Sequence, residues 1–187
     1  MNAILGFTEI LSGLEEDVQK RQYIDSVRTS GKSLLGLIND ILDLSKVEAG
    51  KLELQNEPTD VKALIDELPP ILAQKIQEQG LDLIIEAEDL PIVMVDGLRL
   101  RQMLLNLTSN AIKFTDAGHV RVTVTSDSAE QGVRLTFVVE DTGIGIPPDQ
   151  QNKIFGAFEQ TAGQSTSQYG GTGLGLAISK RLAELMN

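Results

Sequence analysis

The sequence predicts an α+β protein, in which a helical hairpin is followed by a mixed β-sheet with helices on one face. Near the N-terminus, apolar residues recur at alternating steps of three and four, which is typical of a coiled-coil seam. Further along, segments rich in β-branched residues accompany an amphipathic helix, which favours a layered domain. Apolar residues make up 41% of the 187 residues and aromatic residues only 4%, so the core must be aliphatic.

Residues 1–46 are expected to form two helices. The first should cover about 2–14, with a break near Ser12 and Gly13 and a solvated polar stretch over 15–21. Taken alone, this segment predicts a structural hairpin. Two hairpins would pair into a four-helix bundle, because a single one exposes its apolar seam. The seam in the second helix consists of Ile24, Val27, Gly31, Leu34, Ile38, Ile41 and Ser45.

The rest of the chain alternates strands with helices, and its boundary with the hairpin is expected between residues 46 and 58. Strands are predicted at 51–54, 81–87, 92–96, 120–125 and 133–140. Helices are predicted at 98–114, after Pro147-Pro148, and at about 174–186. A polar stretch over 160–168 comes before the last helix.

The composition excludes several classes of function. The net charge of −11 and the pI near 4.5 disfavour nucleic acid or direct membrane contact, so any bound phosphate needs a local site. The absence of cysteine excludes disulfides, thiolate metal sites and thiol nucleophiles. No apolar run approaches the ~20 residues that span a bilayer, and no basic segment marks a signal peptide. A cytoplasmic location is expected, although the parent protein could be membrane-anchored.

A first candidate motif follows a predicted strand. A carboxylate at a strand end can accept a hydrogen bond from an exocyclic amine, and nearby glycines let the backbone approach a flat ligand. A tight turn before a helix explains the same residues equally well. The motif comprises Asp141, Thr142, Gly143, Ile144, Gly145 and Ile146.

A second candidate motif opens the last predicted helix. Successive backbone amides at a helix N-terminus can cradle a phosphate, whereas the alternative is a flexible hinge. The preceding polar stretch favours a mobile lid over a nucleotide. The spacing matches neither the dinucleotide fingerprint nor a Walker A loop. The motif comprises Gly170, Gly171, Thr172, Gly173, Leu174 and Gly175.

A third candidate lies on the helix predicted over 98–114. Asn106 and Asn110 share a face at a spacing of four residues. Amide oxygens suit a Mg²⁺ ion that is already bound to phosphates. Lys113 lies one turn further on, where its ammonium could reach a phosphate. A solvated pair of asparagines is the alternative.

The order and spacing of the three motifs resemble the gyrase-type ATPase superfamily, which includes histidine kinases, type II topoisomerases, heat-shock chaperones and mismatch-repair ATPases. Residues 106–115 look like the N box of histidine kinases, and residues 154–160 look like their F box. Residues 37–50 resemble the end of the dimerisation hairpin in hybrid-type sensor kinases. The resemblance covers essentially the whole chain.

This resemblance implies a truncated dimerisation and phospho-acceptor hairpin over 1–50 and an ATP-binding catalytic domain over 51–187 that lacks its C-terminal strands. Such a kinase transfers the γ-phosphoryl group of ATP to a histidine on the hairpin, for relay to a response-regulator receiver domain. ATP and Mg²⁺ are the implied cofactors, and a homodimer through the N-terminal helices is the implied assembly. A non-catalytic nucleotide-binding or dimerisation module is the alternative.

The resemblance also implies roles for individual residues. Asp141 would bind the adenine amino group. Asn110 would hold Mg²⁺ with Asn106 beside it, and Lys113 would complete the catalytic set. Phe155 and Phe158 would pack and move the lid. The other implied cofactor contacts are Gly143, Gly145, Ile146, Gly171, Thr172, Gly173, Leu174 and Gly175.

The sequence departs from the family pattern at several points. Only Met1-Asn2 matches the end of the acceptor motif, so the acceptor histidine is expected before Met1. The one histidine, His119, is expected to be an ordinary exposed residue. The lid stretch 166–170 has no arginine or lysine where relatives often carry one. The sheet is expected to have an exposed edge, because the family normally adds two strands after the last helix.

Overall fold

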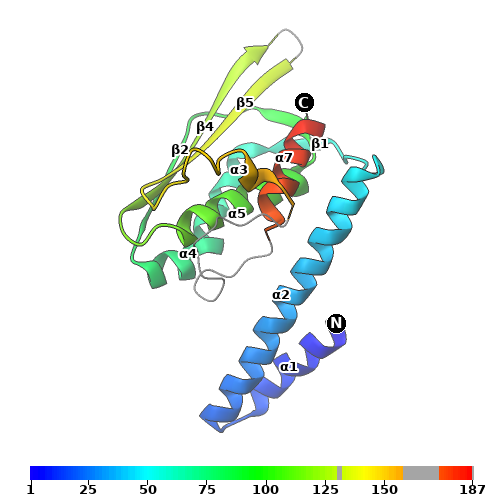
Figure 1. Cartoon of the computed structure of the whole chain (residues 1–187), viewed down its shortest axis with the longest axis vertical. Coiled ribbons are helices and arrows are strands. Elements are labelled where there is room, and N and C mark those ends of the chain that lie inside the picture. Colours follow the sequence, from blue (N-terminus) through cyan, green and yellow to red (C-terminus); the bar gives the residue numbers. More distant parts are fainter. Residues whose placement is uncertain (130–131, 158–172, 187) are drawn as a thin grey trace. The chain divides into compact units, whose positions relative to one another are not determined.

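The computed structural model describes residues 1–129, 132–157 and 173–186 (Figure 1). The chain divides into two compact units, Met1–Leu52 and Glu53–Asn187. None of the described helices has the length and apolar character needed to cross a membrane.

The first unit is a hairpin of helices α1 (Asn2–Leu14) and α2 (Val18–Glu48). The predicted bounds of the first helix are confirmed. The break lies at 15–17, just past Ser12 and Gly13, and Gly13 itself is still helical. Asp17 sets the start of α2 because its carboxylate accepts hydrogen bonds from the backbone N–H groups of Gln19 (2.9 Å) and Lys20 (3.2 Å).

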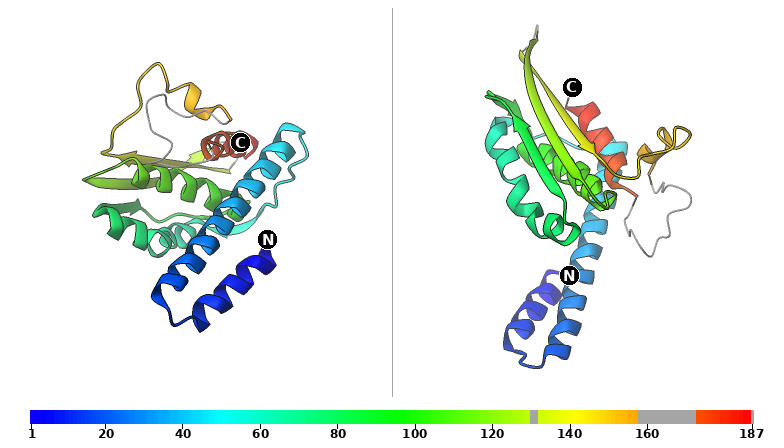
Figure 2. Two further views of the ribbon diagram at one scale, coloured as in Figure 1. Left: turned by 60° about the horizontal axis from the view of Figure 1, so that its bottom comes forward. Right: turned by 90° about the vertical axis from the view of Figure 1, so that its left-hand side faces the viewer.

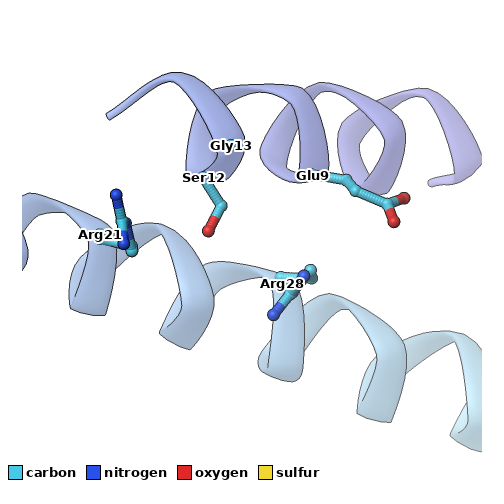
Figure 3. Close-up of a pocket in the computed structure, with 5 residues that line it drawn as sticks. All are labelled: Glu9, Ser12, Gly13, Arg21 and Arg28. Atoms are coloured by element: carbon cyan, nitrogen blue, oxygen red, sulfur yellow. The ribbon is translucent and has the colours of Figure 1, made fainter. Parts of the chain in front are cut away.

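One hairpin leaves most of the apolar seam uncovered. None of the residues of α2 is buried. Between α1 and α2, a hollow of about 380 Å³ is lined by charged and small residues (Figure 3). Its two arginines already have partners: Arg28 pairs with Asp25 at 2.9 Å, and Arg21 Nε donates to the carbonyl oxygen of Glu15 at 3.1 Å. The exposed seam residues are Val27 (52%), Leu34 (47%), Ile38 (40%) and Ile41 (41%).

The second unit contains the mixed sheet that the sequence predicts. Strands β2 (Asp82–Ala87), β4 (His119–Ala129) and β5 (Gly132–Asp141) are ordered β2-β4-β5. β2 pairs with β4 in parallel, whereas β4 and β5 are antiparallel and form a long ribbon (Figure 2). A separate antiparallel pair joins β1 (Glu57–Asp60) to β3 (Ile92–Val95).

Helices cover one face of the three-stranded sheet. On β4, Val120, Val122 and Val124 point into the core and are at most 1% exposed. On the opposite face, Arg121 lies near carboxylates of Glu86 (3.4 Å) and Glu140 (3.8 Å), so that face is polar. The buried hydrophobic residues described are all aliphatic, as the composition predicts. The covering helices are α3 (Val61–Asp66), α4 (Leu68–Gln79), α5 (Gly97–Lys113) and α7 (Gly175–Leu185).

Some predicted elements were wrong. Residues 51–56 form neither strand nor helix, although 51–54 alternate in polarity. Alternation alone does not supply a partner strand. The helix expected after Pro147-Pro148 is, in the described residues, only a 3₁₀ turn, η1 (Lys153–Phe155). Strand β1 and helices α3 and α4 were not predicted.

Candidate nucleotide-binding site

The candidate site is organised around helix α5, whose start is anchored by Asp96. This carboxylate accepts a hydrogen bond from Arg99 N at 3.1 Å, which caps the helix. Its other oxygen accepts one from Gln55 N at 3.0 Å. Asp96 is only 6% exposed, so both bonds are shielded from water and the position of α5 is well defined.

Helix α5 separates a core face from a site face. Leu100, Leu104 and Thr108 are buried toward the sheet, whereas Asn106 and Asn110 are half-buried on another side. The Nδ2 atom of Asn110 donates a hydrogen bond to Oδ1 of Asn106 at 3.4 Å. The structure therefore brings together the two asparagines that the sequence singles out.

Helix α7 packs directly on Asn106. The Nδ2 atom of Asn106 donates a hydrogen bond to Oγ of Ser179 at 2.9 Å. A Cβ atom on Gly175 would overlap Oδ1 of Asn106, so only glycine permits this approach. Ser179 lies outside every motif and was missed by the sequence analysis. The signal that could have found it is its spacing of four residues from Gly175.

The loop after β5 is attached to the other end of the site face. Asp141 is exposed, and its Oδ1 accepts a hydrogen bond from Gly143 N at 2.9 Å, forming a local turn. The N–H of Ile144 donates to the carbonyl oxygen of Phe114, just past α5, at 3.2 Å. Gly145 has a φ of 67°, in the left-handed region, and Ile146 is 43% exposed.

Thr142 belongs to the first motif, but the sequence analysis gave it no role. Its Oγ1 accepts a hydrogen bond from His119 N at 3.0 Å, and its own N–H donates to His119 O at 3.2 Å. These bonds tie the end of β5 to the start of β4. They place Asp141 at a fixed strand end beside α5.

Lys113 gives the site a local positive charge in an otherwise acidic protein. Its Nζ lies 4.6 Å from the centre of the Phe114 ring. Partial burial lowers the pKa of Lys113, and the nearby Lys75 lowers it further. Within the described residues no carboxylate forms an ion pair with Lys113. An anion bound here would relieve both unfavourable effects.

The glycine-rich motif is described only in part. Leu174 is fully buried, so its backbone rather than its side chain would face a ligand. Phe155 comes before the polar stretch in the sequence, and its ring centre lies 5.6 Å from Nζ of Lys180 on α7. Gly173 leads into α7. Gly171, Thr172, Phe158 and the lid stretch 166–170 lie outside the described residues.

The side chains of the site fit a metal ion that enters already bound to phosphate groups. Among the described residues, no three His, Cys, Asp or Glu side chains cluster into a metal site. Asn110 donates through Nδ2, and its Oδ1 accepts no hydrogen bond within that part of the chain. Mg²⁺ commonly takes one or two protein oxygens and fills its other positions with phosphate oxygens and water. An isolated amide oxygen beside a lysine matches that requirement.

Two family models match the chain. Residues 1–50 match the His Kinase A (phospho-acceptor) domain. Residues 95–187 match the histidine kinase-, DNA gyrase B-, and HSP90-like ATPase family. One match lies in each unit of the fold, and residues 51–94 lie outside both matches.

Relatives and solved structures agree with these matches. The sensory/regulatory protein RpfC of Xanthomonas campestris is 40% identical over 190 residues, which are 100% of this chain and 26% of RpfC. The sensor histidine kinase GacS of Pseudomonas protegens is 42% identical over 189 residues, or 100% of this chain and 21% of GacS. The chain thus spans about a quarter of these relatives. Full-length ShkA in complex with AMPPNP superposes with a TM-score of 0.77 at 36% identity, covering 98% of this chain and 37% of ShkA.

Proposed function

Since the chain belongs to the sensor histidine kinases, we propose that it is the ATP-binding catalytic portion of a two-component kinase. The reaction is transfer of the γ-phosphoryl group of ATP to a histidine on the helical hairpin. One observation carries the proposal: both glycine-containing motifs contact helix α5. The loop after β5 does so where Ile144 N donates to Phe114 O, and the start of α7 does so where Gly175 and Ser179 contact Asn106. The three motifs that an ATP site needs are therefore parts of one surface.

The loop after β5 would recognise the base. Gly143 N already occupies one oxygen of the Asp141 carboxylate, which leaves the other oxygen to accept a hydrogen bond from the adenine amino group. The Asp141 side chain is exposed at the strand end, so a planar ligand can approach it. The exposed side chains of Ile144 (57%) and Ile146 (43%) would cover the ring.

The site face of α5 would hold the phosphates. Asn110 would supply an oxygen to Mg²⁺, with Asn106 beside it, and Lys113 would neutralise phosphate charge. The amides at Gly171, Thr172, Gly173, Leu174 and Gly175 would complete the cradle. Bound Mg²⁺ would offset the charge that develops on the transferred phosphoryl group. The residues of the chain would orient the nucleotide and exclude water around it.

The hairpin would supply the dimer contacts, whereas the acceptor histidine would lie outside residues 1–50, which contain no histidine. Its uncovered seam would be buried by a second copy in a four-helix bundle. Residues 1–50 would form this part and residues 51–187 the ATP-binding part. The receiver domain of a response regulator would take the phosphoryl group onward. A protein that uses ATP in this way would act in the cytoplasm.

The test is calorimetric titration of Mg-ATP into the purified chain and into Asp141→Asn. An amide cannot accept the adenine amine as a charged oxygen does, so we expect affinity to fall by at least about tenfold. Asp127→Asn, an exposed position at the far end of β4, is the matched control and should bind as the wild type does. Unchanged affinity in Asp141→Asn would overturn the assignment.

A further inference from the structure

Ser179 on α7 holds one end of a row of three polar side chains that crosses from α7 to α5. Its Oγ accepts a hydrogen bond from Nδ2 of Asn106 at 2.9 Å. Only 8% of Ser179 is exposed, so water competes little for this bond. Losing it would leave an amide N–H group without its partner in a largely dry contact.

In the structure the amide of Asn106 is anchored on α7 and faces Ser179 with its Nδ2 atom. An asparagine has a donor on one side of its amide and an acceptor on the other, so fixing Nδ2 also fixes Oδ1. In this orientation Oδ1 of Asn106 accepts from Nδ2 of Asn110 at 3.4 Å. The amide of Asn110 is oriented in turn, and its own Oδ1 is directed away from Asn106.

Gly175 makes this orientation possible. It lies four residues before Ser179 and hence on the same face of α7. A Cβ atom there would overlap Oδ1 of Asn106 and would push the amide out of its row. This need for glycine is separate from any contact between its backbone amide and a phosphate.

We propose that Ser179 is a positioning residue, which orients Asn106 and, through it, turns the carbonyl oxygen of Asn110 toward the cation of the bound Mg-nucleotide. The proposal rests on the proposed function, because it takes Asn110 as the Mg²⁺ ligand. Ser179 itself touches neither metal nor nucleotide. Without the hydroxyl group the amide of Asn106 loses its anchor on α7 and can leave the row, so that it no longer holds the amide of Asn110 in position.

The experiment measures the affinity of AMPPNP for the full chain, once with Mg²⁺ and once with EDTA. Ser179→Ala should weaken Mg-AMPPNP binding by about 3–10-fold, the worth of one shielded hydrogen bond. Binding without metal should stay within about twofold of the wild type. Ser179→Thr keeps a hydroxyl group and should restore most of the metal-dependent affinity. Arg181→Gln, an exposed position on the same helix, is the matched control.

A second readout follows the side chain directly. In ¹⁵N-labelled protein without ligand, the side-chain NH₂ resonances of Asn106 should shift in Ser179→Ala and return in Ser179→Thr. A purely structural role of Ser179 would lower affinity equally with and without metal, and that result would overturn the proposal. So would wild-type affinity in Ser179→Ala. Failure of the wild type to bind Mg-AMPPNP would refute the proposed function instead, while the NH₂ resonances would still decide whether Ser179 orients Asn106.

Discussion

The carbonyl oxygen of Phe114 packs so closely on Gly143 that a Cβ atom at position 143 would overlap it. The same oxygen accepts the hydrogen bond from Ile144 N. The end of α5 and the loop that follows β5 are thus joined without any side chain between them. The relative position of Lys113 and Asp141 depends on this backbone contact.

Gly143→Ala should therefore damage the site and the fold together. The added methyl group must separate the loop from α5, and we expect the free energy of unfolding to fall by about 1–3 kcal/mol. Nucleotide affinity should fall by more than about tenfold, because Asp141 and Lys113 would no longer be the right distance apart to contact the base and the phosphates together. Urea unfolding and calorimetric titration measure the two effects. Gly36→Ala on α2, with no atom within 4 Å of the added group, is the control and should not lower stability.

The pKa of Lys113 predicts a pH dependence of nucleotide binding. Burial and Lys75 lower this pKa in the free protein, whereas bound phosphates would raise it again. Affinity should be constant at pH values below the lowered pKa, where Lys113 is already charged. It should decrease as the pH rises from the free to the bound value, because binding then requires proton uptake.

Two variants check this sign. Lys113→Arg keeps its charge at high pH and should remove the alkaline decrease. Lys75→Gln removes the repelling charge and should move the decrease to higher pH. Titrations between neutral pH and the alkaline limit of stability measure the shift. An identical profile in wild type and Lys113→Arg would show that Lys113 does not contact the phosphates.

Elements with a clear local period were predictable from the sequence. The first helix matched the observed α1, and the helix expected at 98–114 corresponds to α5 (Gly97–Lys113). Helix α4 was not predicted, because Pro69 and Pro70 suggest a break although both are tolerated in a first helical turn. Strand β1 has only four residues and is defined by its pairing with β3, which no local pattern records.

The candidate site was predictable as a set of motifs but not as an arrangement. The spacing of Asn106 and Asn110 follows from helix geometry, so their contact could be expected. The contacts of Asn106 with Ser179 and of Thr142 with His119 join segments far apart in the chain. Such contacts depend on how the sheet and helices pack, and the spacing of Ser179 from Gly175 places it on a helix face without naming its partner on α5.

Dimer formation should depend on the exposed seam of α2. Ile38→Asp places a charge where a second hairpin would pack, and we expect the dissociation constant of the dimer to rise by at least about tenfold. Sedimentation equilibrium at micromolar concentration measures it. Lys32→Asp introduces the same side chain outside the seam and is the matched control. A wild-type chain that is monomeric in this range would contradict the proposal.

His119, the single histidine of the chain, should not accept a phosphoryl group. It lies at the start of β4, where its backbone is hydrogen-bonded to Thr142 within the ATP-binding unit. Incubation with γ-labelled ATP should leave no acid-labile, base-stable label on the chain, and nucleotide affinity should be the same in His119→Gln. A phosphoramidate on His119 would show that the ATP-binding unit can phosphorylate itself.

The parallel pairing of β2 with β4 has a consequence for how the protein acquires its structure. Asp82 lies opposite His119, so this pairing closes a long connection that contains β3 and the whole of α5. Closing so long a connection costs chain entropy before any ladder bond compensates for it, whereas the α1–α2 hairpin needs only a three-residue turn. During synthesis the helical hairpin should therefore form early, and the nucleotide-binding unit should complete its sheet in a slower step that follows.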